Sequence, residues 1–163
     1  MADRMNVAEL TALIRATSTR MELLLAQLSV ADINQPGAVG VWSVKDALAH
    51  IAFWERYAVN IIRDAVRGAT PVLVADDETE RSNASVVAQY YQRSLAAVIA
   101  DWQQAREDLL EEIAELSEAD LNDPTRFAWS PGITLLEHIA GNSYEHEQEH
   151  IDQIRVWMQV SKG

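Results

Sequence analysis

The residues with the clearest chemical potential are two histidines four apart, His146 and His150, in the run His-Glu-Gln-Glu-His. This run lies within a long stretch that has the periodicity of a helix. Side chains four apart on a helix project from one face, about one turn from each other. Two such imidazoles can bind one divalent metal if another part of the chain supplies at least a third ligand. The spacing therefore predicts half of a metal site.

The two histidines also lie on the apolar face of their predicted helix. Successive residues of a helix are turned by about 100°, so the same stripe includes Leu136, Ile139, Ser143, Ile154 and Trp157. Burying a polar ring among apolar side chains costs free energy unless a partner compensates it. A bound metal would be such a partner, which strengthens the prediction of a site here.

His50 is predicted to supply the third imidazole. It follows the dipeptide Trp-Ser by seven residues and lies at the edge of its own apolar stripe, where it can face a neighbouring helix. His138 occupies the matching place in the second half of the chain, but it is turned away from the stripe. We therefore interpret His50, His146 and His150 as the metal ligands and His138 as a flank residue.

Glu147 is the candidate catalytic residue, because it lies between the two paired histidines in the sequence. It could be a fourth metal ligand, an acceptor that orients an imidazole, or a general base. A position on the solvated face of the helix also stays open for it.

Four long helical segments are needed to position these residues. We predict helices over 7–28, 43–66, 77–116 and 133–160, with a possible break in the third near Ser94. The intervening segments 29–41, 68–76 and 117–132 contain Pro, Gly and Asn and are predicted as loops. Helix starts are marked by residue pairs with the spacing of capping boxes: Asn6 with Glu9, Ser43 with Asp46, and Thr134 with Glu137.

The chain also contains an internal repeat. The segment LSVADINQPGAVGVWSVKDALAHIA begins at Leu28, and a similar segment, LSEADLNDPTRFAWSPGITLLEHIA, begins at Leu116. The repeat predicts two helix-loop-helix halves, over about residues 6–68 and 77–160. Together the halves would form an all-α fold, a four-helix bundle with approximate two-fold symmetry, in a single domain over residues 1–163.

The composition limits the classes of partner and chemistry. The chain has 163 residues, no cysteine and a net charge of −12. Without cysteine there is no disulfide, thiolate metal site or cysteine nucleophile. Strong acidity argues against nucleic acid and anionic membranes as partners, since both require clustered Lys and Arg. No long apolar run and no signal peptide is evident, so we expect a cytoplasmic protein without a membrane partner.

Two segments, VWSVKDALAHIAFWE (41–55) and IAGNSYEHEQEHIDQIRVW (139–157), resemble the DinB-like superfamily. These bacterial four-helix bundles are related to bacillithiol and mycothiol S-transferases and to mycothiol-dependent maleylpyruvate isomerase. The resemblance implies an up-down-down-up bundle with a long crossover between helices two and three. It also implies that His50, His146 and His150 are metal ligands, that the metal is zinc or nickel, and that the protein is a homodimer.

The resemblance implies a small-molecule substrate but leaves several functions open. The leading hypothesis is a transferase that joins a low-molecular-weight thiol to small electrophiles, as in detoxification. A metal-dependent hydrolase and a non-catalytic bundle that binds a small molecule are the alternatives. A related branch of self-resistance proteins generally lacks the complete histidine triad, so the intact triad favours the metal-dependent group. A basic pocket for an acidic thiol would need arginines, and five are candidates: Arg56, Arg63, Arg93, Arg126 and Arg155.

Overall fold

The fold is all-α, as predicted. The computed structural model describes residues 3–162, which form eight helices and no strand. In chain order they are α1 (Val7–Leu25), α2 (Val30–Asn34), α3 (Val44–Val66), α4 (Asp76–Tyr90), α5 (Leu95–Ala114), α6 (Glu118–Asn122), α7 (Leu135–Asn142) and α8 (Tyr144–Lys162). Within the described part of the chain, no helix is both long and apolar enough to cross a membrane.

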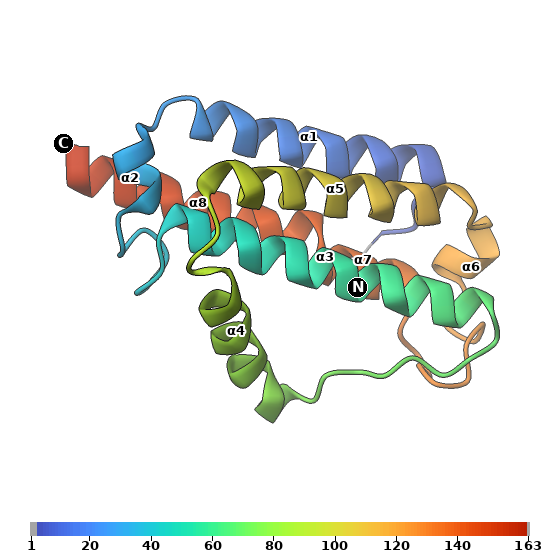
Figure 1. Ribbon diagram of the computed structural model, residues 1–163. Helices are drawn as coiled ribbons and strands as arrows, with labels where there is room; N and C mark the ends of the chain where they lie inside the picture. Colours follow the sequence, from blue (N-terminus) through green and yellow to red (C-terminus); the bar gives the residue numbers. More distant parts are fainter. Residues whose placement is uncertain (1–2, 163) are drawn as a thin grey trace.

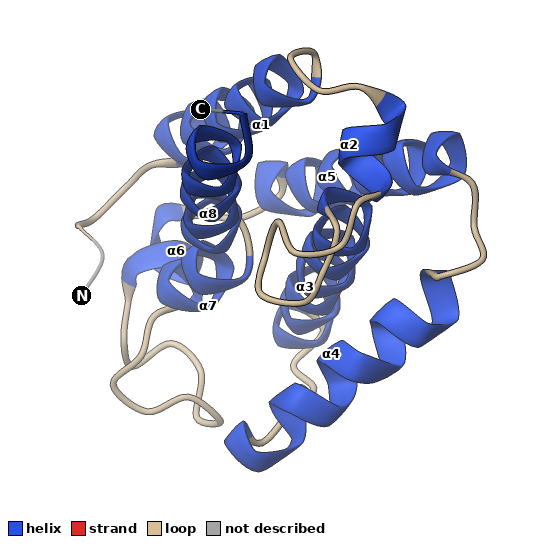
Figure 2. Cartoon of the chain, turned by 90° about the vertical axis from the view of Figure 1, so that its left-hand side faces the viewer, coloured by secondary structure: helices blue, strands red, loops and turns tan. Residues whose placement is uncertain are grey.

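The long helices lie roughly parallel to one another. In Figure 1, α1 and α8 run toward the left of the view, whereas α3 and α5 run toward the right. The closest packing is between α3 and α5 and between α1 and α8. Helix α4 lies outside this group and packs against α3, as the view in Figure 2 shows.

Capping boxes start most of the helices. The three predicted pairs, Asn6–Glu9, Ser43–Asp46 and Thr134–Glu137, are all present. Two more boxes, Ser29–Asp32 and Ser117–Asp120, start the five-residue helices α2 and α6. Both short helices lie in segments that were predicted as loops. The prediction was wrong there because a box formed by a serine and an acidic residue three positions later can start a single turn of helix.

Two predicted helices are divided. The segment 77–116 is broken between Tyr90 and Leu95, and Ser94 caps the new helix by accepting from Ala97 N at 3.2 Å. The segment 133–160 is broken at Ser143, whose backbone angles of −133° and −108° are not helical. The Ser143 hydroxyl donates to Ile139 O at 2.6 Å. The first helix also ends at Leu25, three residues earlier than predicted.

A crossover segment connects α3 to α4. Helix α3 ends at Val66 and is followed by Gly68, whose φ of 74° favours glycine, and Ala69 N donates to Asp64 O at 2.9 Å. The segment then runs back along α3, and Val74 N donates to the Tyr57 hydroxyl at 3.0 Å. This return places α4 beside the middle of α3, where His50 and Trp54 lie.

The apolar core has two clusters, which share the long helices. One includes Leu48, Ile51, Trp102, Ile151 and Ile154, and the other includes Leu10, Ile14, Ile62, Leu109 and Ile113. Each fully buried side chain of this size contributes about 1.5–3 kcal/mol to folding. The core therefore holds α3, α5 and α8 in fixed positions, and these helices carry the candidate site.

Candidate metal centre

His50 is held by the first turns of α3. The capping box at Ser43 fixes the start of this helix, and His50 follows seven residues later with 4% of its surface exposed. The Trp42 ring packs against the imidazole with a centroid separation of 4.8 Å. The Trp-Ser dipeptide thus begins the helix and covers its histidine.

His146 and His150 project from the first two turns of α8 toward His50. The His146 Nε2 atom lies 2.8 Å from the His50 Nε2 atom and 3.0 Å from the His150 Nε2 atom. One potential ligand atom from each of the three residues lies within 4.8 Å of the other two. The structure thus brings together the three histidines that the sequence analysis selected.

All three rings are neutral at pH 7. Burial, followed by the proximity of His150, lowers the pKa of His50 to about 3. Burial lowers the pKa of His146 to about 3 as well, with further contributions from His150 and His50. Burial also lowers the pKa of His150, although a hydrogen bond to Gln153 acts in the opposite direction. Neutral imidazole is the form that binds metals.

The three ring nitrogens are arranged better for binding one cation than for hydrogen bonding among themselves. The Nδ1–H group of His150 donates to Gln153 Oε1 at 2.7 Å, so its Nε2 atom carries a lone pair. A proton on His146 Nε2 can be donated to only one of the two neighbouring nitrogens, which leaves the other unsatisfied. A divalent metal would accept all three lone pairs at once, so the donor set fits zinc or nickel.

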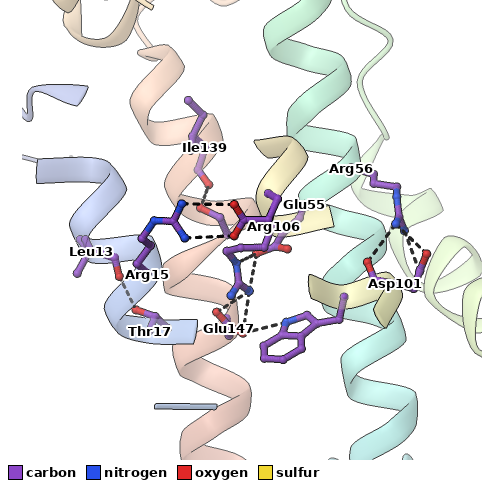
Figure 3. A network of polar contacts seen from close by, with 12 residues as sticks. Leu13, Arg15, Thr17, Glu55, Arg56, Asp101, Arg106, Ile139 and Glu147 are labelled. Atoms are coloured by element: carbon purple, nitrogen blue, oxygen red, sulfur yellow. Dashed lines mark hydrogen bonds and ion pairs between the residues drawn. The ribbon is translucent and has the colours of Figure 1, made fainter. Parts of the chain in front are cut away.

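Glu147 lies in a buried ionic cluster (Figure 3). Arg106 Nη2 donates to both oxygens of the Glu147 carboxylate at 3.0 Å, and Trp102 Nε1 donates to Oε1 at 3.1 Å. Arg106 also donates to Glu55 Oε1 from Nε at 3.0 Å and from Nη2 at 2.9 Å. The exposed fractions of Glu55, Arg106 and Glu147 are 0%, 3% and 1%. The position on the solvated face that the sequence left open for Glu147 is thereby excluded.

The protonation of this cluster keeps its net charge near zero. Burial, and to a smaller extent Glu147, raises the pKa of Glu55 to about 8, although Arg106 acts against this. Burial also raises the pKa of Glu147, but Arg106 and Trp102 oppose the shift with their hydrogen bonds. Glu147 accepts from both Arg106 and Trp102, whereas Glu55 accepts from Arg106 alone, so the contacts stabilise a negative charge on Glu147 more than on Glu55.

His138 belongs to a separate contact. Its Nε2 atom lies 2.8 Å from the Ser130 hydroxyl, and its ring packs against Trp129 with a centroid separation of 5.2 Å. The Trp-Ser dipeptide of the second half thus covers a histidine, as Trp42 does in the first half. His138 is not among the side chains that meet at the centre, which agrees with its interpretation as a flank residue.

A cavity of about 290 Å³ adjoins the centre. Its lining comes from α3, α4, the end of α7 and the start of α8: His50, Trp54, Thr79, Asn83, Gly141, Asn142 and His146. Apart from the two histidines, none of the described residues that line it is ionisable. None of the five candidate arginines lines this cavity, and Arg56, for example, forms an ion pair with Asp101 at 2.8 Å.

Several residues of this region escaped the sequence analysis. Gln153 was missed although it lies three positions after His150, a spacing at which helical side chains meet. No sequence pattern could have indicated Asn83, because its neighbour Trp54 is distant in the sequence. The burial of Glu55 and Glu147 could have been predicted from their spacing. Glu55 lies four residues after Ile51, and Glu147 lies four before Ile151, so both occupy core positions of their helices.

Comparisons with known proteins agree with this architecture. The family model described as the DinB superfamily matches residues 12–154. No curated protein sequence matches the chain. An uncharacterised protein from Escherichia coli UTI89 has a similar structure, with a TM-score of 0.81 and 17% identity over 96% of this chain and 95% of the other.

Two further solved structures are similar. One is DfsB, described as a sibling lethal factor precursor, with a TM-score of 0.83 and 20% identity over 98% of each chain. The other is the colibactin self-resistance protein ClbS in complex with double-stranded DNA, with a TM-score of 0.82 and 14% identity over 96% of each chain. At these identities the similarity shows the fold alone. The ClbS complex nevertheless counts against our exclusion of nucleic acid, which was based on the net charge.

Proposed function

This chain belongs to the DinB superfamily, and we propose that it is a metal-dependent enzyme that transfers a low-molecular-weight thiol to small electrophiles. The observation that carries the proposal is the meeting of three neutral imidazoles, with Nε2 atoms 2.8 and 3.0 Å apart, beside a small cavity. In this proposal His50, His146 and His150 hold zinc or nickel. A divalent metal held by three imidazoles supplies a Lewis acid with an open position for a thiol.

The neutral lining of the cavity favours thiol transfer over hydrolysis. A free thiol has a pKa of about 8.5, whereas that of water is about 15.7, so a thiol needs much less assistance to lose its proton. Among the described residues that line the cavity there is no carboxylate to serve as a general base. The chain has no cysteine, so the sulfur must arrive with a substrate.

The proposed reaction forms one bond between the thiol sulfur and an electrophilic carbon. The thiol proton passes to solvent, and the leaving group of an alkyl halide departs as halide. With an epoxide, the C–O bond breaks and the oxygen takes up a proton. The protein contributes orientation and exclusion of water, for which the rigid helices α3 and α8 are suited.

We assign Glu147 a positioning role in this scheme. Its carboxylate is fully engaged by Arg106 and Trp102, so it ties α8 to α5 at the residue next to His146. A general base or a fourth ligand would need a free oxygen directed at the metal. The contacts therefore favour a supporting role over the other two roles considered for Glu147.

Metal content measured by elemental mass spectrometry, on protein purified without a histidine tag, tests the proposal. The parent is expected to contain about one equivalent of zinc or nickel, and a His146→Ala/His150→Ala double variant almost none. His138→Ala is the matched control and should retain the metal of the parent. A parent that is empty and takes up no added metal would overturn the proposal and leave a bundle that binds small molecules without a metal.

If the metal is present, thiols and electrophiles can be assayed in pairs. Thioether formation that needs both the metal and an added thiol supports transfer. Product formation without a thiol would instead establish the hydrolase. The predicted homodimer is tested separately, by light scattering coupled to size-exclusion chromatography.

A further inference from the structure

A hydrogen bond between side chains joins the crossover helix α4 to α3 at the edge of the cavity. Trp54 Nε1 donates to Asn83 Oδ1 at 2.9 Å. Indole N–H is a donor only, so this bond fixes which end of the Asn83 amide faces Trp54. The orientation of the Asn83 side chain is thereby set by the protein before any ligand binds.

The Asn83 amide lies next to the metal centre. Asn83 lines the same cavity as His50 and His146. A ligand atom in this cavity therefore meets the two histidines and Asn83 together.

The Nδ2 amide nitrogen of Asn83 is left available as a donor. Its two N–H groups make no hydrogen bond to any other residue that the structure describes, because only Oδ1 is engaged. The other polar side chains of the cavity are partly or fully engaged: Asn142 Nδ2 uses one of its two N–H groups on His138 O at 2.8 Å, and the Thr79 hydroxyl donates to Ala75 O at 3.3 Å. Asn83 is thus the free, oriented side-chain donor of this lining.

We propose that Asn83 is a specificity-determining residue, which donates from Nδ2 to a neutral carbonyl or amide oxygen of the thiol held beside His50 and His146. The inference rests on the proposed function and specifies its thiol substrate. A neutral oxygen fits better than a carboxylate, because no cationic side chain lines the cavity and the chain carries a net charge of −12. A site with a donor of this kind discriminates against analogues that lack the acceptor.

Two thiols of the same shape provide the probe. 3-Mercaptopropanamide carries the amide oxygen, and 3-methylbutane-1-thiol replaces the amide with an apolar branch. Each is titrated into the cobalt(II)-loaded protein, and binding is followed by the absorption band of the cobalt–thiolate bond. The proteins are the parent, Asn83→Ala, Trp54→Phe and Ser85→Ala. Ser85 is an exposed residue of α4, so its variant is the matched control for changes in this helix.

The expected result is selective. Asn83→Ala should weaken the binding of 3-mercaptopropanamide by about fivefold to tenfold, the value of one hydrogen bond, and leave that of 3-methylbutane-1-thiol unchanged. Trp54→Phe should give a smaller loss of the same kind, because the amide keeps its donor but can rotate. Ser85→Ala should match the parent with both thiols, and cobalt content and helicity should be equal in all four proteins.

Three other results can be distinguished from this one. If both thiols bind the parent and Asn83→Ala weakens them equally or not at all, the assignment of Asn83 is wrong and the proposed function stands. If neither thiol alters the spectrum of the cobalt-loaded parent, the thiol function fails and the assignment fails with it. An equal loss in Trp54→Phe and Asn83→Ala would show that the bond serves only to dock α4, which also overturns the assignment.

Discussion

The burial of the three histidines makes the metal-free protein sensitive to acid. His50 and His146 have a pKa of about 3 in the folded state and of 6.5 when unperturbed. Between these values the unfolded chain binds protons that the folded chain does not, so the free energy of unfolding falls as the pH falls. The slope is about 1.4 kcal/mol per pH unit for each histidine, and it is absent above pH 6.5 and below pH 3.

Urea unfolding at several pH values between 7.5 and 4 measures this slope. A His50→Leu/His146→Leu double variant should lose the contribution of both rings and be less sensitive to acid than the parent. His138→Ala is the comparison: burial lowers the pKa of His138 as well, so this variant should lose some of the dependence, but less than the double variant. Equal slopes in the parent and the double variant would show that the two rings are already protonated in the folded protein.

Glu55 is expected to destabilise the protein as the pH rises. Its ordinary pKa is 4.5, and in the folded state it is about 8. Between these values the unfolded carboxyl is ionised and the folded one is protonated, so the free energy of unfolding decreases by about 1.4 kcal/mol per pH unit. Glu55→Gln keeps the neutral state that accepts from Arg106. The variant should therefore gain stability relative to the parent as the pH is raised from 5 to 8.

Denaturation midpoints at pH 5, 6, 7 and 8 test this difference. Arg15→Ala is a useful comparison, because it removes an exposed ion pair with Glu107, which is worth at most about 1 kcal/mol. Its effect should be small at every pH. A constant difference between Glu55→Gln and the parent over this range would mean that Glu55 is ionised in the fold.

The residues of the site were predictable to different degrees. His146 and His150 are four apart, so their relation is local and helix geometry alone reveals it. The prediction of His50 as a ligand required a helical-wheel analysis of a second helix and the resemblance to a family. The orientation of Glu147 was not found, because its partner Arg106 is 41 residues away. An acidic residue on a helix is usually solvated, and only a matching charge at a core position of another helix changes that expectation.

At the level of the helices, the starts were easier to predict than the ends and breaks. A capping box depends on residues three positions apart, so Ser43 and Thr134 could be read directly from the sequence. The break at Ser143 lies inside a continuous helical pattern of apolar residues, and Gly141 two residues earlier is the one local residue that disfavours a helix there. It accompanies the burial of Tyr144 and Glu147 against other helices, which is a tertiary effect.

Helix α4 is expected to be the least protected of the long helices. Val86 is its one buried residue, and α3 is its main neighbour. Helices with few buried contacts open locally at low free energy. Hydrogen exchange followed by mass spectrometry should show faster exchange over residues 76–90 than over α3 or α5.

The bond between Trp54 and Asn83 should limit this opening. Trp54→Phe is expected to accelerate exchange in α4 by about fivefold, the effect of losing about 1 kcal/mol, without changing α5. Ser85→Ala again serves as the control. If α4 and α5 were equally protected from exchange in the parent, the expectation that α4 opens most easily would be wrong.

At the level of the whole molecule, the metal centre connects parts of the chain that are distant in sequence. His50 and His146 are 96 residues apart, and they meet only when α3 and α8 are packed. The unfolded chain therefore lacks the site, so metal binding adds to the free energy of unfolding. A metal concentration 100 times the dissociation constant should contribute about 2.7 kcal/mol. For a domain of this size, that corresponds to an increase in melting temperature of roughly 5–10 °C.

Thermal unfolding with and without nickel or zinc measures this coupling. The increase should disappear in His50→Ala, which removes the ligand on α3 while leaving both histidines of α8 in place. It should persist in His138→Ala, because Ser130 and Trp129 hold that ring away from the centre. An undiminished increase in His50→Ala would mean that the metal binds on α8 alone. The centre would then stabilise the protein without linking the two halves of the chain.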